Sequence, residues 1–326
     1  MSYTDKTTKN LFYSKINDVL IPCSGETALD ISTSTCVLQD NIIIGGDLNV
    51  LRPKLQNGKY LSYLLSNKKR VVIAKYAQGD SIVHLYGEKI KNINIDLPTI
   101  EEQEKVSKLL EILNKKIKLQ KKKIEALKIY KKGLINKLLN SNDTLNWKHI
   151  KLNDILLPGS KEKVLDTSKF QKINIKLNLK GLFKNNSNRE MADTRPFYIR
   201  NVNEIIIGKQ NYFNGSIAIV TDDFDGCICS NAIMSFSIKN DNPKFIYYYI
   251  SQPNYIKKRA FLANGTGQKE LSEKEFLNFE IYLPSIEEQN YIVNILDFVE
   301  SKFNIENSKY EDLKLMKKSL LQQMFI

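Results

Sequence analysis

Two stretches of the chain carry apolar residues at alternating spacings of four and three, which is the pattern of a helix that pairs along one seam. The seam of the first stretch runs from Val106 to Leu138, and that of the second runs from Ile292 to Met324. Each stretch follows a proline and begins with two glutamates, which favour a helix N-terminus. The pattern therefore predicts two long helices that form a coiled coil. The seam residues expected to meet a partner helix are Leu110, Leu113, Ile117, Leu127, Leu296, Phe303, Tyr310 and Leu313.

Both seams are polar at the same two steps, where Gln120 matches Glu306 and Lys131 matches Lys317. A polar residue in an apolar seam costs stability and fixes the register and the partner of the helix. A surface helix that tolerates polar positions is the alternative interpretation.

The two helical stretches open with nearly the same motif. Residues 97–103 (LPTIEEQ) match residues 283–289 (LPSIEEQ) at an offset of 186. The match continues without a gap to Leu139 and Phe325, and 15 of the 43 aligned positions are identical. Similarity between two lysine-rich helices does not by itself produce the shared opening motif, so the sequence indicates an internal repeat.

The repeat extends into the segments before the helices. Residues 17–21 align with 203–207 at the same offset, and residues 59–66 align with 244–251 at an offset of 185. Small insertions between such anchors are tolerated in surface loops. The chain is therefore one module used twice. Because residues 147–181 have no counterpart, we expect the first module to lack about forty residues at its start.

Each module also contains a part with mixed secondary structure. The apolar runs at 41–46 and 215–220 are bounded by Gly, Asp and Asn, which is typical of short strands and turns. Residues 60–65 and 245–250 resemble buried helices, although the pattern also allows strands for runs of this length. The predicted class is α+β, with two similar domains that are each followed by a long helix. The predicted boundaries are 1–98 and 144–284 for the domains and 99–143 and 285–326 for the helices.

Charge points to the kind of partner. The chain has 326 residues, with 49 Lys and Arg against 36 Asp and Glu, and the net charge of +13 suits a polyanion or an acidic protein surface. Residues 99–140 have a net charge of +7 and residues 285–326 one of −2, which favours pairing of the two helices with each other. No apolar run is as long as a membrane helix, and the polar start lacks the apolar core of a signal peptide, so we expect a cytoplasmic protein.

Sequence motifs for catalysis are absent. The chain has no Gly-x4-Gly-Lys-[Ser/Thr] loop, no Gly-x-Gly-x-x-Gly after a strand and no Asn-Pro-Pro-[Tyr/Phe] motif. His84 and His149 lie in different parts of the chain, which disfavours a His-based metal site or a Ser-His-Asp triad. Asp222, Asp223 and Asp225 are better explained as a solvated turn than as a metal site. We therefore expect no enzyme activity, metal or cofactor in this chain.

The cysteines and the glycine-rich stretch also have simple explanations. Neither Cys23 with Cys36 nor Cys227 with Cys229 has the spacing of a zinc knuckle, so all four are interpreted as reduced packing residues. Residues 265–267 (GTG) are better explained as a loop that each module needs than as a phosphate-binding loop.

Several segments resemble one known protein family. The motif LP[TS]IEEQ, followed by a lysine-rich helix with KKGLI at 131–135 or KKSLL at 317–321, resembles the conserved helical regions of specificity (S) subunits of type I restriction-modification systems. Residues 147–154 (WKHIKLND) resemble the start of that family's target recognition domains, and residues 45–53 (GGDLNVLRP) resemble their middle. The resemblance covers essentially the whole chain.

The resemblance implies a function and a set of partners. Each target recognition domain is expected to bind one half of a split target in double-stranded DNA. The two helices are expected to run antiparallel as a spacer and to dock two modification (methyltransferase) subunits, with restriction subunits in the full complex. S-adenosylmethionine is expected on the modification subunit and ATP on the restriction subunit. The first recognition domain departs from the family pattern, because its opening segment is missing.

Candidate DNA contacts are basic or amide side chains. The basic triplets at 68–70 and 257–259 occur in roughly corresponding places and suit phosphate contacts, although a basic triplet is also common on a solvated surface. Base recognition favours Arg, Lys, Asn and Gln, with Ser24 and Glu26 as further candidates in the first domain. The candidate DNA-binding residues are Lys68, Lys69, Arg70, Lys75, Gln78, Asn185, Asn186, Asn188, Arg189, Lys209, Gln210, Lys257, Lys258, Arg259, Gln268 and Lys269.

Two other classes of protein fit parts of the pattern. A coiled-coil adaptor with two protein-binding domains would carry its positive charge incidentally, and its binding to DNA would lack the steep salt dependence of phosphate contacts. A nuclease that uses scattered Asp, Glu and Lys residues would need metal-dependent cleavage by the isolated chain. DNA sequence recognition without catalysis is the leading hypothesis.

Overall fold

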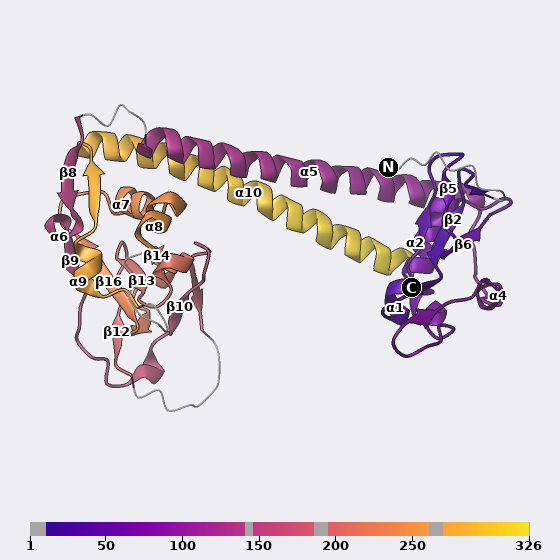
Figure 1. Cartoon of the computed structure of the whole chain (residues 1–326), viewed down its shortest axis with the longest axis horizontal. Coiled ribbons are helices and arrows are strands. Elements are labelled where there is room, and N and C mark those ends of the chain that lie inside the picture. The colour runs from indigo at the N-terminus through magenta and orange to yellow at the C-terminus, as the bar shows by residue number, and fades with distance from the viewer. Residues whose placement is uncertain (1–10, 141–145, 186–194, 261–269, 326) are drawn as a thin grey trace. The chain divides into compact units, whose positions relative to one another are not determined.

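Two long helices follow the LP[TS]IEEQ motifs, namely α5 (Ile100–Asn140) and α10 (Ile286–Met324) (Figure 1). The glutamates of each motif lie in the first turn of the helix, where negative charge complements the helix dipole. The observed helices fall within the predicted spans 99–143 and 285–326. The prediction of two long helices is confirmed.

The computed structural model describes residues 11–140, 146–185, 195–260 and 270–325. They form two units. The first contains the described residues up to Glu125 together with those from Asn304 onward, and the second runs from Ala126 to Phe303. Each unit therefore joins one mixed domain to a segment of both long helices.

The mixed domain of the first unit contains a three-stranded antiparallel sheet in the order β4 (Thr35–Cys36), β2 (Val19–Pro22), β6 (Leu48–Leu51). Two further antiparallel pairs are β1 (Phe12–Tyr13) with β5 (Ile43–Ile44) and β3 (Ser24–Gly25) with β7 (Val83–His84). The short helices are α1 (Ala28–Ile31), α2 (Gly58–Ser66), α3 (Arg70–Ala74) and α4 (Gly87–Ile90).

The core of the first unit includes both long helices. Val19 and Ile21 of β2 are fully buried, and they belong to one apolar cluster with Leu64 of α2 and Leu110 of α5. Phe325, just after α10, completes this cluster. Burial of these side chains stabilises the domain and attaches it to the helices at the same time.

The mixed domain of the second unit has a four-stranded antiparallel sheet in the order β14 (Ile217–Ile219), β13 (Ile205–Gly208), β16 (Ile233–Ile238), β9 (Leu156–Pro158). Three antiparallel pairs accompany it: β10 (Ile173–Ile175) with β11 (Leu182–Lys184), β12 (Phe197–Ile199) with β15 (Ile228–Ser230), and β17 (Glu280–Leu283) with β8 (Lys148–Lys151). The short helices are α6 (Leu152–Ile155), α7 (Pro243–Ile250), α8 (Pro253–Arg259), α9 (Glu273–Leu277) and the 3-10 turns η2 (Thr167–Lys169), η3 (Tyr212–Asn214) and η4 (Asp222–Phe224).

The long helices pack antiparallel within each unit. In the second unit, Lys128 lies over the ring of Phe303 and Lys131 bonds to Glu300, so rising numbers on α5 meet falling numbers on α10. In the first unit, Gln120 bonds to Glu306, whereas Leu110 shares a core cluster with residues at the end of α10. The antiparallel arrangement is confirmed in each unit.

The nominated seam residues are buried to different degrees. Leu110, Leu113 and Leu296 are buried, and the other nominated seam residues are half-buried: Ile117, Leu127, Phe303, Tyr310 and Leu313.

The internal repeat is visible in the fold. Strand β2 corresponds to β13 at the offset of 186, and each strand follows an asparagine in the left-handed conformation, Asn17 (φ 79°) or Asn203 (φ 67°). Helices α2 and α7 contain the predicted helical runs at 60–65 and 245–250. The short strands β5 and β14 lie within the runs predicted as strands and turns at 41–46 and 215–220. The α+β class and the two similar domains are confirmed.

Among the residues that the structure describes, no helix is both long enough and apolar enough to cross a membrane. All four cysteines are free thiols, with Cys227 and Cys229 buried and Cys23 and Cys36 half-buried.

Candidate nucleic-acid interface

The motif glutamine of the first unit joins the long helix to the mixed domain. The Gln103 side chain is buried, and its Nε2 donates to the carbonyl oxygen of Pro98 (3.0 Å). Its Oε1 accepts from the backbone N–H of Asn57, the N-cap residue of α2 (3.0 Å). A buried amide with both ends bonded fixes the position of α2 on the start of α5.

The second unit repeats this arrangement. Gln289 Nε2 donates to the carbonyl oxygen of Pro284 (3.0 Å), and its Oε1 accepts from the backbone N–H of Asn242 (2.9 Å), the N-cap residue of α7. The last residue of the LP[TS]IEEQ motif is therefore a structural residue that positions each mixed domain on its long helix.

An ion pair repeats in the same place. Lys59 of α2 bonds to Glu111 of α5 (2.8 Å), and the matching Lys244 of α7 bonds to Asp297 of α10 (2.6 Å). The hydrogen bond from Lys59 lowers the pKa of Glu111. Tyr248 Oη donates to the same Asp297 carboxylate (2.7 Å), and burial together with this bond raises the pKa of the tyrosine. These contacts fix α2 and α7 on the helices at equivalent points.

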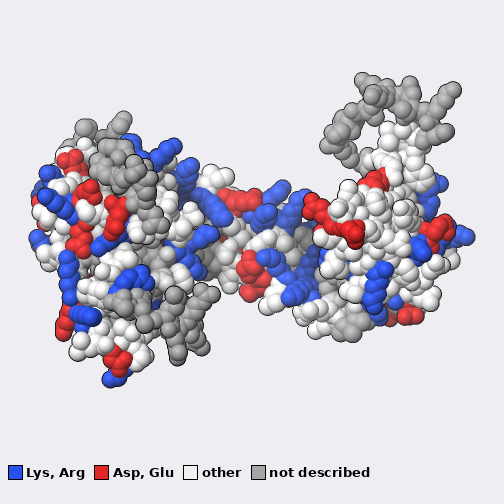
Figure 2. Space-filling model, turned by 60° about the horizontal axis from the view of Figure 1, so that its bottom comes forward, with Lys and Arg blue, Asp and Glu red and all other residues white. Residues whose placement is uncertain are grey.

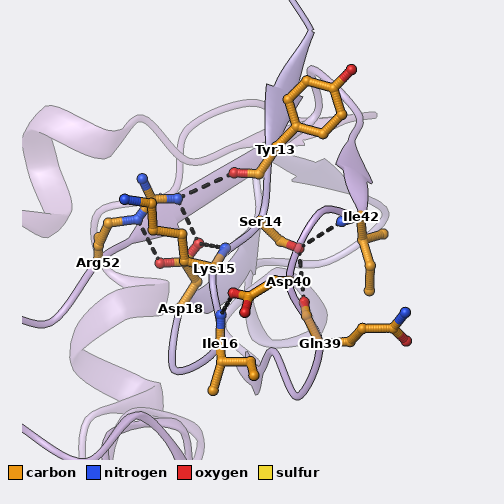
Figure 3. A network of polar contacts seen from close by, with 9 residues as sticks. All are labelled: Tyr13, Ser14, Lys15, Ile16, Asp18, Gln39, Asp40, Ile42 and Arg52. Carbon is orange, nitrogen blue, oxygen red and sulfur yellow. Dashed lines mark hydrogen bonds and ion pairs between the residues drawn. The ribbon is translucent and has the colours of Figure 1, made fainter.

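A buried carboxylate lies at the start of the central strand of the first unit (Figure 3). Asp18, with a side chain only 1% exposed, accepts two bonds from Arg52, from Nε and from Nη2, both of 2.8 Å. Arg52 Nη2 also donates to the carbonyl oxygen of Tyr13 (3.2 Å). The Arg52 guanidinium lowers the pKa of Asp18. Arg52 lies in the segment 45–53, and no sequence pattern indicated its pairing with Asp18.

The same network fixes the neighbouring loop. Ser14 Oγ donates to the carbonyl oxygen of Gln39 (3.0 Å) and accepts from the backbone N–H of Ile42 (2.9 Å). Asp40 Oδ1 accepts from the backbone N–H of Ile16 (2.6 Å). Figure 3 shows these bonds beside the Asp18–Arg52 pair, so the β1–β5 pair is attached to the domain by polar contacts.

In the second unit, Glu204 takes the position of Asp18 with different partners. Ser235 Oγ donates to Glu204 Oε2 (2.5 Å), and buried Arg200 lies 4.0 Å from that oxygen. Arg200 Nε also lies 3.0 Å from the Cys229 sulfur. Burial raises the pKa of the Cys229 thiol, which keeps it protonated and disfavours a nucleophilic role.

The basic triplet of the first unit precedes and begins α3. The Lys68 side chain is exposed and that of Lys69 half-buried. Arg70 donates from Nε and Nη2 to the carbonyl oxygen of Leu29 (3.1 and 3.0 Å), and so connects α3 to α1. Phosphate contact is thus better suited to the two lysines.

The triplet of the second unit ends α8, so the two triplets occupy different positions in their domains. Lys257 and Lys258 are exposed. Arg259 stacks on the ring of Tyr255 at 3.4 Å and donates to the carbonyl oxygens of Tyr255 (3.2 Å) and Glu280 (3.0 Å). Arg259 therefore connects α8 to β17, whereas the two exposed lysines are accessible to a polyanion.

The remaining nominated residues are scattered. Lys75, Gln78 and Gln210 are exposed, whereas Lys209 and Asn185 are half-buried. Gly79 has a φ of 123°, and a Cβ there would lie 2.2 Å from the Ile82 carbonyl oxygen, so the turn beside Gln78 requires glycine. Five nominated residues lie outside the described residues, namely Asn186, Asn188, Arg189, Gln268 and Lys269, as does the loop at 265–267.

Positive charge is distributed over both units. On the face drawn in Figure 2, Lys and Arg side chains are interspersed with Asp and Glu, so charge alone does not delimit an interface there. Among the described residues, no group of three or more His, Cys, Asp and Glu side chains is arranged to bind a metal. Asp225, one of the aspartates considered above, accepts from the backbone N–H of Val202 (2.8 Å).

A groove of about 1050 Å³ lies beside the helix pair of the first unit. Lys314, Lys317 and Lys318 of α10 line it, together with Ile117 of α5 and Leu321 of α10. Most of the lining surface is apolar, and the lining also includes Glu311, which pairs with Lys314 (2.9 Å).

The second unit contains a groove of about 590 Å³ with the same chemistry. Its lining includes Lys128, Lys131 and Lys132 of α5, with Ile135 and Phe303 as apolar members. At the offset of 186, these three lysines align with the three lysines of the first groove. Ile117 of the first groove likewise aligns with Phe303 of the second. The Lys-Lys motifs at 131–132 and 317–318 are visible in the sequence, but their spacing does not indicate that each lines a groove.

Comparisons with known proteins agree with one another. A family model described as the type I restriction modification DNA specificity domain matches residues 1–128 and 144–315. The Type I restriction enzyme MjaVIII specificity subunit of Methanocaldococcus jannaschii is 22% identical over 343 residues, covering 97% of this chain and 79% of the relative. The putative type I restriction enzyme MjaX specificity subunit of the same organism is 28% identical over 307 residues, covering 86% and 70%.

A solved structure also has this fold. The S subunit of a Type-I restriction-modification system from M. genitalium superposes with a TM-score of 0.64 at 18% identity, covering 97% of this chain and 84% of that chain.

Proposed function

Because the chain belongs to the family of type I restriction modification DNA specificity domains, we propose that it is the DNA sequence-recognition subunit of a type I restriction-modification complex. The observation that carries this proposal is the family match, which includes both repeats of the chain. Each mixed domain binds one half of a bipartite target in double-stranded DNA. The subunit acts in the cytoplasm, where that DNA lies.

The structure of the repeat supports a bipartite target. Gln103 and Gln289 attach each mixed domain to its helix by the same pair of bonds, and Lys59 and Lys244 add equivalent ion pairs. A domain that is fixed on a rigid helix keeps its DNA-binding surface in one orientation. Two such domains on one chain therefore suit a target with two half-sites.

The proposed subunit is not catalytic. The sequence lacks phosphate-binding and amino-methyltransferase motifs, and the buried polar groups near the sheets are used in structural bonds, as Glu204 and Arg200 illustrate. Methyl transfer with S-adenosylmethionine belongs to the modification subunit, and ATP-dependent cleavage belongs to the restriction subunit.

The two equivalent grooves support docking of the same partner twice. Each has a largely apolar lining and three lysines, of which Lys314 pairs with Glu311 and Lys131 with Glu300. The two remaining lysines of each groove suit an acidic amphipathic segment. Two copies of one modification subunit would meet this surface once in each unit. Restriction subunits would join the assembled complex. The family match favours this function over the protein adaptor considered above.

Methylome sequencing tests the function directly. The chain is expressed with the modification subunit of its own genome in a host without other methyltransferases, and a strain with the modification subunit alone is the control. We expect a single bipartite motif that appears only when both genes are present. Methylation of the same motif without this chain would contradict a role in sequence recognition.

A further inference from the structure

The β10–β11 hairpin of the second unit has one buried and one open face. Cross-strand pairs are Ile173 with Lys184, Asn174 with Phe183, and Ile175 with Leu182. Ile173 is buried, and Ile175 and Leu182 pack against the same apolar cluster. Because side chains alternate between the two faces of a strand, Asn174 and Phe183 lie together on the opposite, partly exposed face.

Lysines surround this open face. Residues 171–185 contain Lys172, Lys176, Lys180 and Lys184 and no acidic residue. Lys176 lies over the ring of Phe183 (5.6 Å) and Lys172 over that of Phe197 (4.8 Å). Neither these two lysines nor Lys180 forms an ion pair with an acidic residue in the described part of the chain. Their positive charge is therefore available to a ligand.

Lys184 differs from the other three. It is paired with buried Ile173 across the hairpin, and it lies over the ring of Phe224 (5.9 Å) on the side of η4. The η4 segment carries Asp222 and Asp223. Lys184 thus belongs to the domain-facing side of the hairpin and serves as a matched control.

The hairpin is fixed to the domain through its turn. Asn178 and Leu179 both have left-handed backbones (φ 60° and 58°), a conformation that is unfavourable for a leucine. Their N–H groups donate to the carbonyl oxygens of Asn214 (2.8 Å) and Gly215 (3.0 Å), and Leu179 packs against the core. A Cβ on Gly215 would lie 3.0 Å from the Leu179 nitrogen. These contacts keep the ribbon in one orientation.

Resting on the function proposed above, we propose that this hairpin is the ribbon with which the second recognition domain enters the major groove of DNA. A two-stranded β-ribbon fits the width of that groove. Lys172, Lys176 and Lys180 bind phosphates on its borders. The Asn174 amide faces base edges, where asparagine pairs with adenine, and the Phe183 ring offers an apolar contact for a thymine methyl group.

The phosphate contacts are tested by the salt dependence of binding. The full chain and its Lys172→Gln, Lys176→Gln, Lys180→Gln triple variant are titrated with short random-sequence duplexes at several salt concentrations. The slope of log affinity against log salt is expected to fall by about 0.9 for each lost phosphate contact, with no such change for Lys184→Gln. An unchanged slope in the triple variant overturns the ribbon proposal. Absence of duplex binding by the unmodified chain would instead remove the proposed function itself.

The base contact is tested separately with Asn174→Ala. In the complex with the modification subunit, we expect discrimination at one base position of one half-site to fall roughly tenfold, while the other half-site and the salt slope remain unchanged. An unchanged motif overturns the assignment of Asn174. If the triple lysine variant retained its salt slope but lost the modification subunit, the hairpin would be a protein interface, which contradicts the proposal.

Discussion

Gln120 of α5 and Glu306 of α10 occupy equivalent positions of the two repeats and bond directly to each other. Gln120 Nε2 donates to the Glu306 carboxylate and to its backbone carbonyl oxygen, both at 2.7 Å. The two positions are related by the offset of 186, so the equivalent polar positions of the two seams contact each other. Lys123 (2.9 Å) and Lys309 (3.2 Å) also bond to Glu306. The bonds between Gln120 and Glu306 therefore fix the register of the two helices, which is the role predicted for a polar position in the seam.

Low pH should weaken the bonds that Glu306 accepts from Gln120 and Lys123. The bond from Gln120 and then that from Lys123 lower the pKa of Glu306 to about 2, from an ordinary value of 4.5. Because the folded value is the lower one, the carboxylate stabilises the fold fully above the unfolded pKa, and this contribution is lost as the pH falls toward the folded pKa. We expect the melting temperature of the wild type to fall between about pH 5 and pH 2.

The matched variant is Glu306→Gln, which keeps the size of the side chain but removes its titration and one of the two oxygens that accept from Gln120 and Lys123. It should be less stable than the wild type near neutral pH and should lose less stability over the same acid range. A wild type and variant with parallel melting profiles would show that Glu306 does not contribute through its charge.

Replacement of Gln103, the motif glutamine of the first unit, should lower the stability of that unit. Gln103→Glu retains the acceptor for the Asn57 N–H but has no donor for the Pro98 carbonyl, and a buried unpaired group costs about 1–3 kcal/mol. Urea unfolding should show this loss of stability. Glu101→Gln, an exposed change in the same motif, is the control and should have little effect. Equal stability of both variants would contradict a structural role for Gln103.

The parts of the fold that could be predicted are those in which sequence spacing directly reflects burial. Leu110 and Leu296 are buried because the four-three spacing places them on one helix face, and the shared motif revealed the repeat. The sheets were harder to predict from the sequence, because strands such as β4, with two residues, are too short to show a periodic pattern of apolar residues. Their pairings also join distant segments, such as Leu20 with Val50.

The candidate site was harder to predict for a similar reason. Arg259 belongs to a basic triplet in sequence, but its stacking on Tyr255 depends on the fold. Lys317 and Ile117 line one groove although 200 positions separate them, so no local pattern joins them. The alternation of Lys172, Asn174 and Lys176 was present in the sequence, but only the observed hairpin shows which face is open.

A charged residue on the long helix should destabilise the fold only where its position in the seam is buried. Leu113 is 5% exposed and its neighbour Ile112 is 46% exposed. Leu113→Asp is expected to lower the free energy of unfolding by about 3–5 kcal/mol, because it leaves an unpaired charge in an apolar seam. Ile112→Asp should change it by about 0.5 kcal/mol or less, as is usual for surface sites. Chemical denaturation checks both, and similar losses in the two variants would contradict the seam.

The residues of the triplet at 257–259 should have two different roles, DNA binding for the lysines and domain stability for Arg259. Replacing Lys257 and Lys258 with Gln should weaken binding to all duplexes alike and flatten the salt slope by about one unit per lost contact, with the melting temperature unchanged. Arg259→Gln should instead destabilise the domain by about 0.5–2 kcal/mol, because the stacking on Tyr255 is lost and the Glu280 carbonyl oxygen keeps only the Tyr255 hydroxyl as a donor. Duplex titration and thermal melting distinguish the two results. A changed target motif with an unchanged slope would place the lysines on bases instead.

The equivalent grooves should each determine the binding of one modification subunit. Lys317→Glu with Lys318→Glu reverses the charge of the groove in the first unit, and Lys131→Glu with Lys132→Glu does so in the second. An acidic partner segment would be repelled, since like charges at an interface cost affinity. Native mass spectrometry of the complex should show one modification subunit for either double variant and none when all four changes are combined.

The control for this experiment is a double variant at Lys121 and Lys122, exposed residues of α5 that line neither groove. Changing both to Glu alters the net charge equally, and the complex should keep two modification subunits. Circular dichroism of each variant establishes that the helices are retained. Loss of both subunits from a variant in one groove would show that the partners bind as a preformed pair, and retention of both in the fourfold variant would exclude the grooves as docking sites.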